Sequence, residues 1–245
     1  CSWPSGHCGS SPVAARIAYG QQRQHNTSQQ RPERPTMAAC LSDFIAAFAH
    51  SPIACLNPAT PWELTSQSDQ AVHRLLNLLD LREYHIANGL AVHNSCVVET
   101  GAVLKPPLVL GPDCFVAAGA YLRGGNWVAE RCIFGPGAEL KSSFVFAGSK
   151  LAHFNFVGDS VLGADVNLEA GSIICNYRNE RPDKEVLVRI ASGLQRTGCL
   201  KFGALVGDGA RIGANAVIAP GALLSPGTVV RRTTLLDDES PTSGT

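Results

Sequence analysis

The sequence predicts an all-β fold, a parallel β-helix of hexapeptide repeats preceded by a short helical segment. The first observation is a six-residue period of apolar residues that runs from Val92 to Ala152 and resumes later. The second is a small residue four positions after many of them, such as Cys96, Ala102 and Cys114. The third is composition, since 24 glycines and only 7 % aromatic residues favour frequent turns around a core of small side chains.

The segment before the repeats has two parts. Residues 1–36 are rich in Gln, Ser, Arg and Pro, so we expect a disordered, non-native leader with the natural start at Met37. Residues 37–89 are predicted to form a helical cap over the open end of the solenoid; a direct role in function is the alternative. A helix start is indicated by Thr60, with proline next and Glu63 at the third helical position. One helical face follows, at Val72, Leu75, Leu76 and Leu79.

Residues 90–232 are predicted to form the solenoid, with three hexads making a triangular coil of 18 residues. Proteins with this repeat coil left-handed, a hand that the sequence itself does not specify. A charged insert at 176–199 interrupts the repeat and is expected to leave the coil as a loop, while residues 233–245 form a flexible tail. The inward ladder is predicted at Val92, Val98, Leu104, Leu110, Val116, Leu122, Val128, Phe134, Leu140, Phe146 and Ala152, then at Phe156, Leu162, Leu168 and Ile174, and then from Leu200 and Val206 onward.

Charge and cysteine usage exclude several classes of function. With 20 basic and 20 acidic residues the formal charge is +0, which gives no case for nucleic acid or an anionic membrane as partner. No apolar run approaches the roughly 20 residues of a membrane span. Cys96, Cys114 and Cys132 share one phase of the repeat, so we interpret them as buried thiols in a reducing, cytoplasmic compartment. A zinc site like that of γ-type carbonic anhydrases needs three histidines, and the repeats contain only His93 and His153.

Three cations share another phase of the repeat. Lys105, Arg123 and Lys141 lie 18 residues apart, so an ideal coil stacks them at one corner about 4.8 Å from one another. Such a column suits a phosphate group. The alternative is a solvated basic stripe balanced by Asp159, which falls next in phase.

His153 lies where the predicted ladder breaks phase. It follows Lys141 by 12 residues, which places the two at different corners, on the order of 15 Å apart. They can share a site only through the phase break or through a neighbouring subunit. His153 is therefore either a ligand or base, or part of a packing irregularity. Phe154 and Phe156 form a possible patch for subunit contact.

The residues around His153 resemble a known family. Lys141, His153, the run Phe156-Val157-Gly158-Asp159, and Cys175-Asn176-Tyr177 are similar to the acetyltransferase domain of the bifunctional glucosamine-1-phosphate acetyltransferase/N-acetylglucosamine-1-phosphate uridyltransferase. A group of short solenoid proteins related to that domain looks closer still. That group shares a Lys-Phe-Gly-Ala segment, found here at 201–204. The resemblance covers about residues 90–232.

The resemblance implies a role for each matching residue. His153 matches the general base, and Arg123 and Lys141 match residues that hold the sugar phosphate. Phe156 stands where the enzyme has a sugar-phosphate tyrosine, and Ala204 stands where it has a serine near the cofactor. The remaining matches are Asn167 and Lys184 as sugar and phosphate contacts, and Asn176 and Tyr177 near the thioester in a site completed across subunits. Arg231 is a further candidate for the phosphate end of CoA.

The expected function is therefore acyl transfer, with acetyl-CoA as donor and the amine of an amino-sugar phosphate or sugar nucleotide as acceptor. A neutral amine must lose a proton on attacking a thioester, and histidine has a suitable pKa to accept it. The resemblance implies a homotrimer, and the acyl transfer itself requires no metal. Uridylyl transfer is not expected. The rival hypothesis is a non-catalytic sugar-phosphate-binding or trimerising module.

Overall fold

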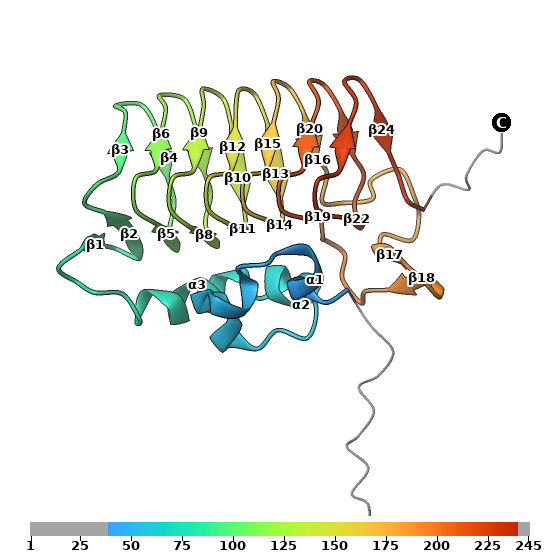
Figure 1. Cartoon of the computed structure of the whole chain (residues 1–245), viewed down its shortest axis with the longest axis horizontal. Helices are drawn as coiled ribbons and strands as arrows, with labels where there is room; N and C mark the ends of the chain where they lie inside the picture. Colours follow the sequence, from blue (N-terminus) through green and yellow to red (C-terminus); the bar gives the residue numbers. More distant parts are fainter. Residues whose placement is uncertain (1–38, 240–245) are drawn as a thin grey trace, which may run out of the picture. The chain divides into compact units, whose positions relative to one another are not determined.

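The computed structural model describes residues 39–239, and the expectations for residues 1–36 and for the last part of the predicted tail, 240–245, lie outside the described residues. The first part of that tail is not a free segment, because Leu235–Leu236 form the last strand of the solenoid, which therefore extends beyond residue 232. Within the described part, three parallel sheets wind around one apolar core, and the predicted left-handed parallel β-helix is confirmed (Figure 1). Each coil contributes one short strand to each sheet. The backbone of every coil therefore donates its hydrogen bonds to the next coil along the axis.

The strands fall into the three faces of the prism. Sheet A contains β1 (Tyr84–Ala87), β2 (Leu90–His93), β5 (Leu108–Leu110), β8 (Asn126–Val128), β11 (Phe144–Val145), β14 (Val161–Leu162), β19 (Ala204–Val206) and β22 (Ala222–Leu224). Sheet B contains β3 (Val97–Val98), β6 (Phe115–Val116), β9 (Ile133–Phe134), β12 (Lys150–Leu151), β15 (Asn167–Leu168), β20 (Arg211–Ile212) and β23 (Val229–Val230). Sheet C contains β4 (Val103–Leu104), β7 (Tyr121–Leu122), β10 (Glu139–Lys141), β13 (Phe156–Gly158), β16 (Ile173–Ile174), β21 (Val217–Ile218) and β24 (Leu235–Leu236).

The coils are not all of one length. Val103 pairs with Tyr121, 18 residues later, whereas Glu139 pairs with Phe156, only 17 residues later. The missing residue lies in the turn after Lys141, so the phase changes there and not at His153. The predicted inward positions Phe146, Ala152 and Phe156 are therefore wrong. The residues that point into the core are one position away, at Val145, Leu151 and Val157.

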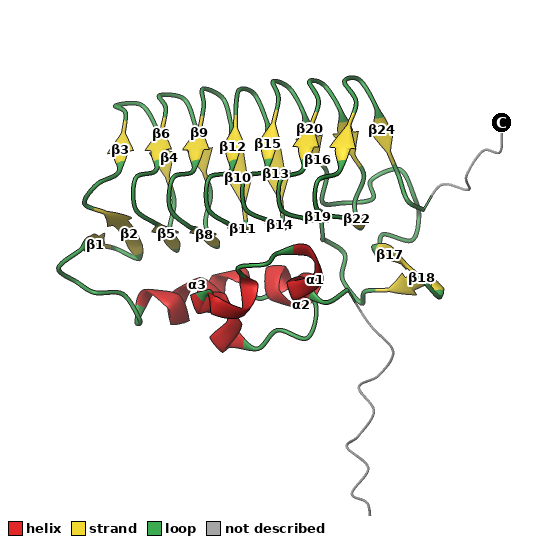
Figure 2. Cartoon of the chain, in the orientation of Figure 1, coloured by secondary structure: helices red, strands yellow, loops and turns green. Residues whose placement is uncertain are grey.

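The helical segment lies along a face of the solenoid and not across its open end (Figure 2). The outward side chains of sheet A are apolar, and Val109, Trp127 and Phe144 are buried beneath the helices. At the open end, β1 pairs antiparallel with β2 and extends sheet A instead. The helical layer consists of α1 (Leu41–Phe44), η1 (Phe48–His50), η2 (Pro52–Leu56), α2 (Pro61–Ser66) and α3 (Ser68–Leu76).

Between β16 and β19 the chain leaves the coil. It forms an antiparallel hairpin of β17 (Leu187–Ile190) and β18 (Gly193–Arg196) before returning at Ala204. Leu200 is exposed in the returning segment, so the prediction that the ladder resumes there is wrong. Ala204 is the first residue after the insert whose side chain enters the core, and Val206 follows it.

Candidate functional site

A groove of about 500 Å³ lies at the corner between sheets C and A. The solenoid supplies one wall, because β7 is followed by Arg123, β10 ends at Lys141 and β13 begins at Phe156. The insert supplies the other wall, with Asn176 and Tyr177 where the chain leaves the coil and Lys201 where it returns. We call the groove formed by these six residues the cationic groove: Arg123, Lys141, Phe156, Asn176, Tyr177 and Lys201.

Two of its three cations are paired with carboxylates. Arg123 Nη1 lies 3.0 Å from Glu139 Oε1, and Lys141 Nζ lies 2.8 Å from Asp159 Oδ2. Lys201 is exposed and forms no ion pair with any residue in the range 39–239. The groove thus combines two paired cations with one cation that has no ion pair in the described range, which favours an anionic group.

The column predicted from the 18-residue spacing is present, with one change of register. Backbone hydrogen bonds from Lys105 to Leu122 and from Arg123 to Leu140 place the cations on successive coils. Lys141 pairs with Gly158, because this coil is one residue short. The Asp159 carboxylate nevertheless reaches Lys141 from the next position and balances its charge.

A buried ladder of polar side chains holds the backbone under these cations. The Asn126 amide donates to the carbonyl of Arg123, and its oxygen accepts from Ser143 N at 2.8 Å. The Ser143 hydroxyl donates to the carbonyl of Lys141 at 2.7 Å and accepts from Ser160 N at 3.1 Å. Satisfied buried networks of this kind are rigid, so Arg123 and Lys141 project from a fixed backbone.

Asn176 and Tyr177 face the cations across the groove. The Asn176 amide donates to the Asp159 carboxylate that also binds Lys141. Gly158 permits this approach, since a Cβ there would lie 2.7 Å from Asn176 Nδ2. The Lys184 ammonium lies 5.5 Å from the centroid of the Tyr177 ring and donates to the carbonyl of Asn179 at 2.6 Å. Lys184 therefore flanks the groove without lining it.

His153 lies elsewhere on the same chain, in the turn between β12 and β13. Its side chain is exposed, its carbonyl accepts from Gly171 N, and it does not line the cationic groove. Phe154 beside it is 71 % exposed and has a φ of 51°. Gly135 permits this turn, because a Cβ there would overlap the carbonyl oxygen of Ala152. A single chain thus keeps His153 and Lys141 apart, as the spacing predicted.

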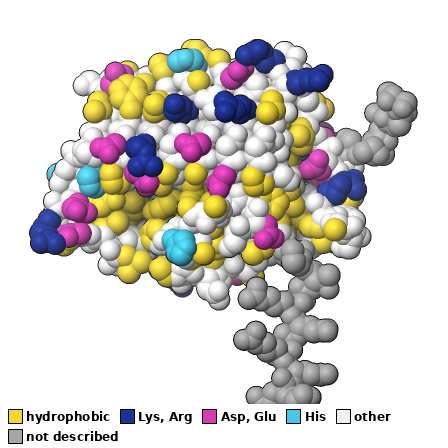
Figure 3. Space-filling view, in the orientation of Figure 1, with side chains coloured by type: hydrophobic (Ala, Val, Ile, Leu, Met, Phe, Trp, Pro, Cys, Tyr) yellow, Lys and Arg dark blue, Asp and Glu magenta, His cyan; other side chains and the backbone are white. Residues whose placement is uncertain are grey.

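A second groove, of about 480 Å³, crosses the outer face of sheet B near its last strands. We call it the sheet B groove, and its polar lining consists of Asn167, Glu169, Arg211, Arg231 and Arg232. Arg232 Nη2 lies 2.7 Å from Glu169 Oε1. The hydrogen bond from Arg232 and a second from Ala214 N lower the pKa of Glu169. Figure 3 shows Lys and Arg side chains gathered over the part of this face that carries β12, β15 and β20.

The structure therefore separates the predicted site residues into groups. Arg123, Lys141, Phe156, Asn176 and Tyr177 meet in the cationic groove, whereas Asn167 and Arg231 meet in the sheet B groove. Ala204 joins neither, since it is 0 % exposed within the core and its N–H donates to Ser160 Oγ. Lys201 was missed as a site residue, although a lysine at the end of a charged insert was a signal for it.

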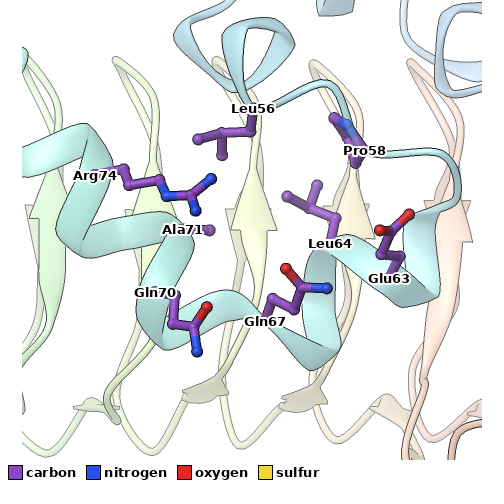
Figure 4. A pocket seen from close by; sticks show the side chains of 8 residues that line it. All are labelled: Leu56, Pro58, Glu63, Leu64, Gln67, Gln70, Ala71 and Arg74. Carbon is purple, nitrogen blue, oxygen red and sulfur yellow. The ribbon is translucent and has the colours of Figure 1, made fainter.

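The remaining features carry less chemistry. A pocket of about 40 Å³ lies in the helical layer, with Arg74 and Glu63 at its two ends (Figure 4). It contains none of the predicted site residues. Among residues 39–239, no three His, Cys, Asp or Glu side chains are grouped so that they could hold a metal ion. In the same range, no helix has the length and apolar character needed to cross a membrane.

Comparison with known proteins finds relatives that are named as bifunctional proteins. No family model matches the chain. It is 39 % identical to the bifunctional protein GlmU of Heliobacterium modesticaldum over 92 residues, which cover 38 % of this chain and 18 % of that protein. It is 31 % identical over 149 residues to a bifunctional sugar-1-phosphate nucleotidylyltransferase/acetyltransferase of Sulfurisphaera tokodaii, covering 54 % of this chain and 37 % of that protein. The chain thus spans well under half the length of these curated relatives.

Among solved structures, PerB from Caulobacter crescentus is 18 % identical, with a TM-score of 0.26 over 73 % of this chain and 75 % of that chain. The acetyltransferase domain of PglB from Neisseria gonorrhoeae is 13 % identical, with a TM-score of 0.30 over 59 % of this chain and 50 % of that chain. Scores this low carry no argument about function. The sequence matches confirm that this hexapeptide-repeat β-helix is similar to the bifunctional GlmU proteins.

Proposed function

We propose that this chain is a CoA-dependent N-acyltransferase that transfers an acetyl group to the amine of an amino-sugar phosphate or sugar nucleotide. The observation that carries the proposal is the cationic groove, in which Lys201 has no carboxylate partner in the described range and Phe156 and Tyr177 supply flat apolar surface. This groove lies on a solenoid similar to relatives named as bifunctional nucleotidylyltransferase/acetyltransferases. A phosphate beside Arg123, Lys141 and Lys201 leaves the sugar ring to the aromatic side chains.

The sheet B groove is the proposed site for the phosphates of the acyl donor. Arg211, Arg231 and Arg232 line it, and only Glu169 opposes their charge within its lining. Asn167 is in β15, which pairs on one side with β20, the strand of Arg211, and on the other with β12, the strand that precedes the turn of His153. A pantetheine arm that leaves this groove along sheet B can deliver its thioester toward His153.

The reaction needs one base and no covalent enzyme intermediate. The amine nitrogen attacks the thioester carbonyl carbon, and a C–N bond forms as the C–S bond breaks. His153 accepts the proton that the amine loses and returns it to the departing thiolate, which leaves as CoA. A general base of this kind contributes about 10² to 10⁴ in rate.

The distance between His153 and the cationic groove within one chain implies a shared site. His153 lies at the corner between sheets B and C. In a homotrimer, this corner of one subunit can meet the corner between sheets C and A of its neighbour, where the cationic groove lies. The exposed Phe154 beside His153 provides apolar surface for that contact. The stacked thiols, of which Cys114 and Cys132 are buried and Cys96 is half-buried, fit a reducing compartment such as the cytoplasm.

Subunit complementation tests the proposal. His153→Ala and Lys141→Ala are each expected to abolish acetyl transfer from acetyl-CoA to glucosamine 1-phosphate, measured as thiol release. Mixed oligomers of the two variants are expected to regain part of the wild-type rate, because some interfaces then combine an intact His153 with an intact Lys141. Homo-oligomers of each variant, carried through the same mixing, are the controls. Turnover that His153→Ala leaves unchanged would contradict the role of the base.

One observation favours the non-catalytic alternative: His153 does not line the groove that binds the proposed acceptor. A sugar-phosphate-binding module would bind glucosamine 1-phosphate with an affinity that depends on Lys141 and Lys201, yet show no turnover with any acyl-CoA. Calorimetry on the wild-type chain, beside the thiol-release assay, separates the two functions.

A further inference from the structure

Arg178 is the feature of the insert that the proposed reaction leaves unexplained. It directly follows Asn176 and Tyr177, yet it is only 3 % exposed although its neighbours in the sequence are polar and charged. Nη1 donates to Asp237 Oδ2 at 2.9 Å and Nη2 donates to Asp237 Oδ1 at 2.8 Å, so the carboxylate is held by both arms of the guanidinium. Nη2 also donates to the carbonyl of Pro220 at 2.8 Å.

The carboxylates come from the segment that follows β24. We call residues 237–239 the acidic strap. Glu239 Oε1 lies 3.0 Å from Arg178 Nη2 and accepts from Leu187 N at 3.2 Å. The carbonyl of Asp238 accepts from Arg189 Nε at 2.7 Å, and Glu239 also pairs with Arg181. The strap therefore binds both the base of the insert and the first strand of its hairpin.

A buried guanidinium of this kind depends on its partners. Burial acts to lower the pKa of Arg178, but its hydrogen bonds with Asp237 and the charges of Glu239 and Asp237 outweigh burial, so the pKa is raised. Removing one partner of a buried ion pair leaves an uncompensated charge, which the chain relieves by moving that charge into water. Without the strap, the carboxylate that still faces Arg178 is that of Glu180, an exposed side chain 3.3 Å from Nη1. Arg178 is therefore expected to leave its buried position and take the adjoining backbone with it.

The adjoining backbone carries one wall of the cationic groove. Within residues 39–239 the Tyr177 side chain makes no hydrogen bond, and its ring is contacted by the Lys184 ammonium at 5.5 Å. No hydrogen bond of its own side chain therefore fixes Tyr177. The residues on either side of Tyr177 hold its backbone in place. Asn176 donates a hydrogen bond to Asp159, and Arg178 donates to Asp237 of the strap.

We infer that Arg178 is a positioning residue, and that the acidic strap, through Arg178, holds Asn176 and Tyr177 in the geometry that binds the acceptor. The inference rests on the proposed function, because it takes the cationic groove as the acceptor site. The strap thereby becomes part of the site although none of its residues lines the groove.

The test compares Asp237→Asn with the full-length wild type and with a matched control, Asp80→Asn. Asp80 also pairs with an arginine, Arg82, but in an exposed turn before β1. Hydrogen exchange measured without ligand is expected to rise about tenfold or more in residues 176–200 of Asp237→Asn and nowhere else. The dissociation constant for glucosamine 1-phosphate is expected to rise about tenfold, while Asp80→Asn matches the wild type in both measurements. Arg178→Lys, which keeps the charge but loses the two-armed contact, is expected to behave like Asp237→Asn.

Three outcomes would overturn the inference. The first is unchanged exchange in residues 176–200 of both variants, which would show that the strap does not hold the insert. The second is faster exchange with unchanged affinity, which would show that it does not position the groove. The third is faster exchange throughout the solenoid, the sign of a merely structural role. If the wild type itself binds no sugar phosphate, the proposed function fails and the positioning role fails with it, while the exchange measurement still decides whether the strap holds the insert.

Discussion

The Lys141–Asp159 pair is the least exposed ion pair of the cationic groove. The side chains are 18 % and 8 % exposed, and Asp159 accepts from Asn176 as well as from Lys141. The carboxylate cannot readily exchange these partners for water. Lys141 therefore has two roles, one toward the ligand and one toward the stability of the folded chain.

Replacing Lys141 by alanine is expected to lower the free energy of unfolding by about 1 to 3 kcal/mol, because it leaves a buried carboxylate with one fewer partner. Urea denaturation followed by circular dichroism measures this change. Lys201→Ala is the control, since an exposed side chain without an ion pair in the described range should change stability by less than about 0.5 kcal/mol. Both variants should lose affinity for a sugar phosphate. Equal stability of the two variants would show that the pair is functional only.

The turns between strands carry a second column of side chains, the three stacked thiols at the corner between sheets A and B. Cys96 donates to the carbonyl of Gly111 at 3.0 Å, and Cys114 donates to that of Ala129 at 3.0 Å. Hydrogen bonding with the neighbouring thiol Cys132, together with burial, raises the pKa of Cys114 to about 12. The pKa of Cys96 is raised as well, by its bond with Cys114 and by burial.

These thiols predict a loss of stability at alkaline pH. A thiol whose folded pKa lies above its unfolded value of about 8.5 stabilises the fold fully below that pH and progressively less as pH rises toward the folded value. By pH 10 the loss is expected to reach about 1 to 2 kcal/mol for Cys114. Urea midpoints between pH 7 and pH 10 should fall in the wild type and fall less steeply in Cys114→Ala. If the urea midpoint fell equally with pH in the two proteins, the raised pKa of Cys114 would be contradicted.

The strands themselves show what a periodic sequence can predict. The six-residue period located the coils, and Thr60 caps α2 as predicted, with its hydroxyl accepting from Glu63 N at 3.1 Å. The inward register was lost after Leu140. Helices cover the outer face of sheet A, so Phe144 and Phe146 are apolar on the outside while Val145 is apolar on the inside. Apolarity alone cannot choose between adjacent buried positions on two sides of one sheet.

The sequence predicts the site residues that are placed by the repeat spacing, and it does not predict those that are placed by the insert. The cation column followed from an 18-residue repeat, and the groove indeed contains Arg123 and Lys141. Lys201 and Arg178 reach their places through a hairpin whose path has no period. Ala204 lies in the core because the length of the insert decides which residue resumes the inward ladder. The repeat period does not predict that length.

The assembled protein is expected to be a homotrimer in which Phe154 is covered. This side chain is 71 % exposed in the single chain and lies beside His153. Phe154→Asp places a charge in that contact and is expected to yield monomers and to lose acetyl transfer. Sedimentation at micromolar concentration measures the change, and Leu81→Asp, at a 73 % exposed position before β1, should remain trimeric. A wild-type monomer at that concentration would count against a site shared between subunits.

The acidic strap also sets an order of assembly. The N-terminal part of a chain emerges from the ribosome first, and segments generally fold as they emerge. The coils that carry Arg123 and Lys141 can stack as soon as they emerge, and the insert follows them. Asp237 and Glu239 are synthesised only after β24. Until then Arg178 has no carboxylate from the strap, so the nascent chain has a stacked solenoid with an incomplete groove and gains affinity for its acceptor only after residues 237–239 have emerged.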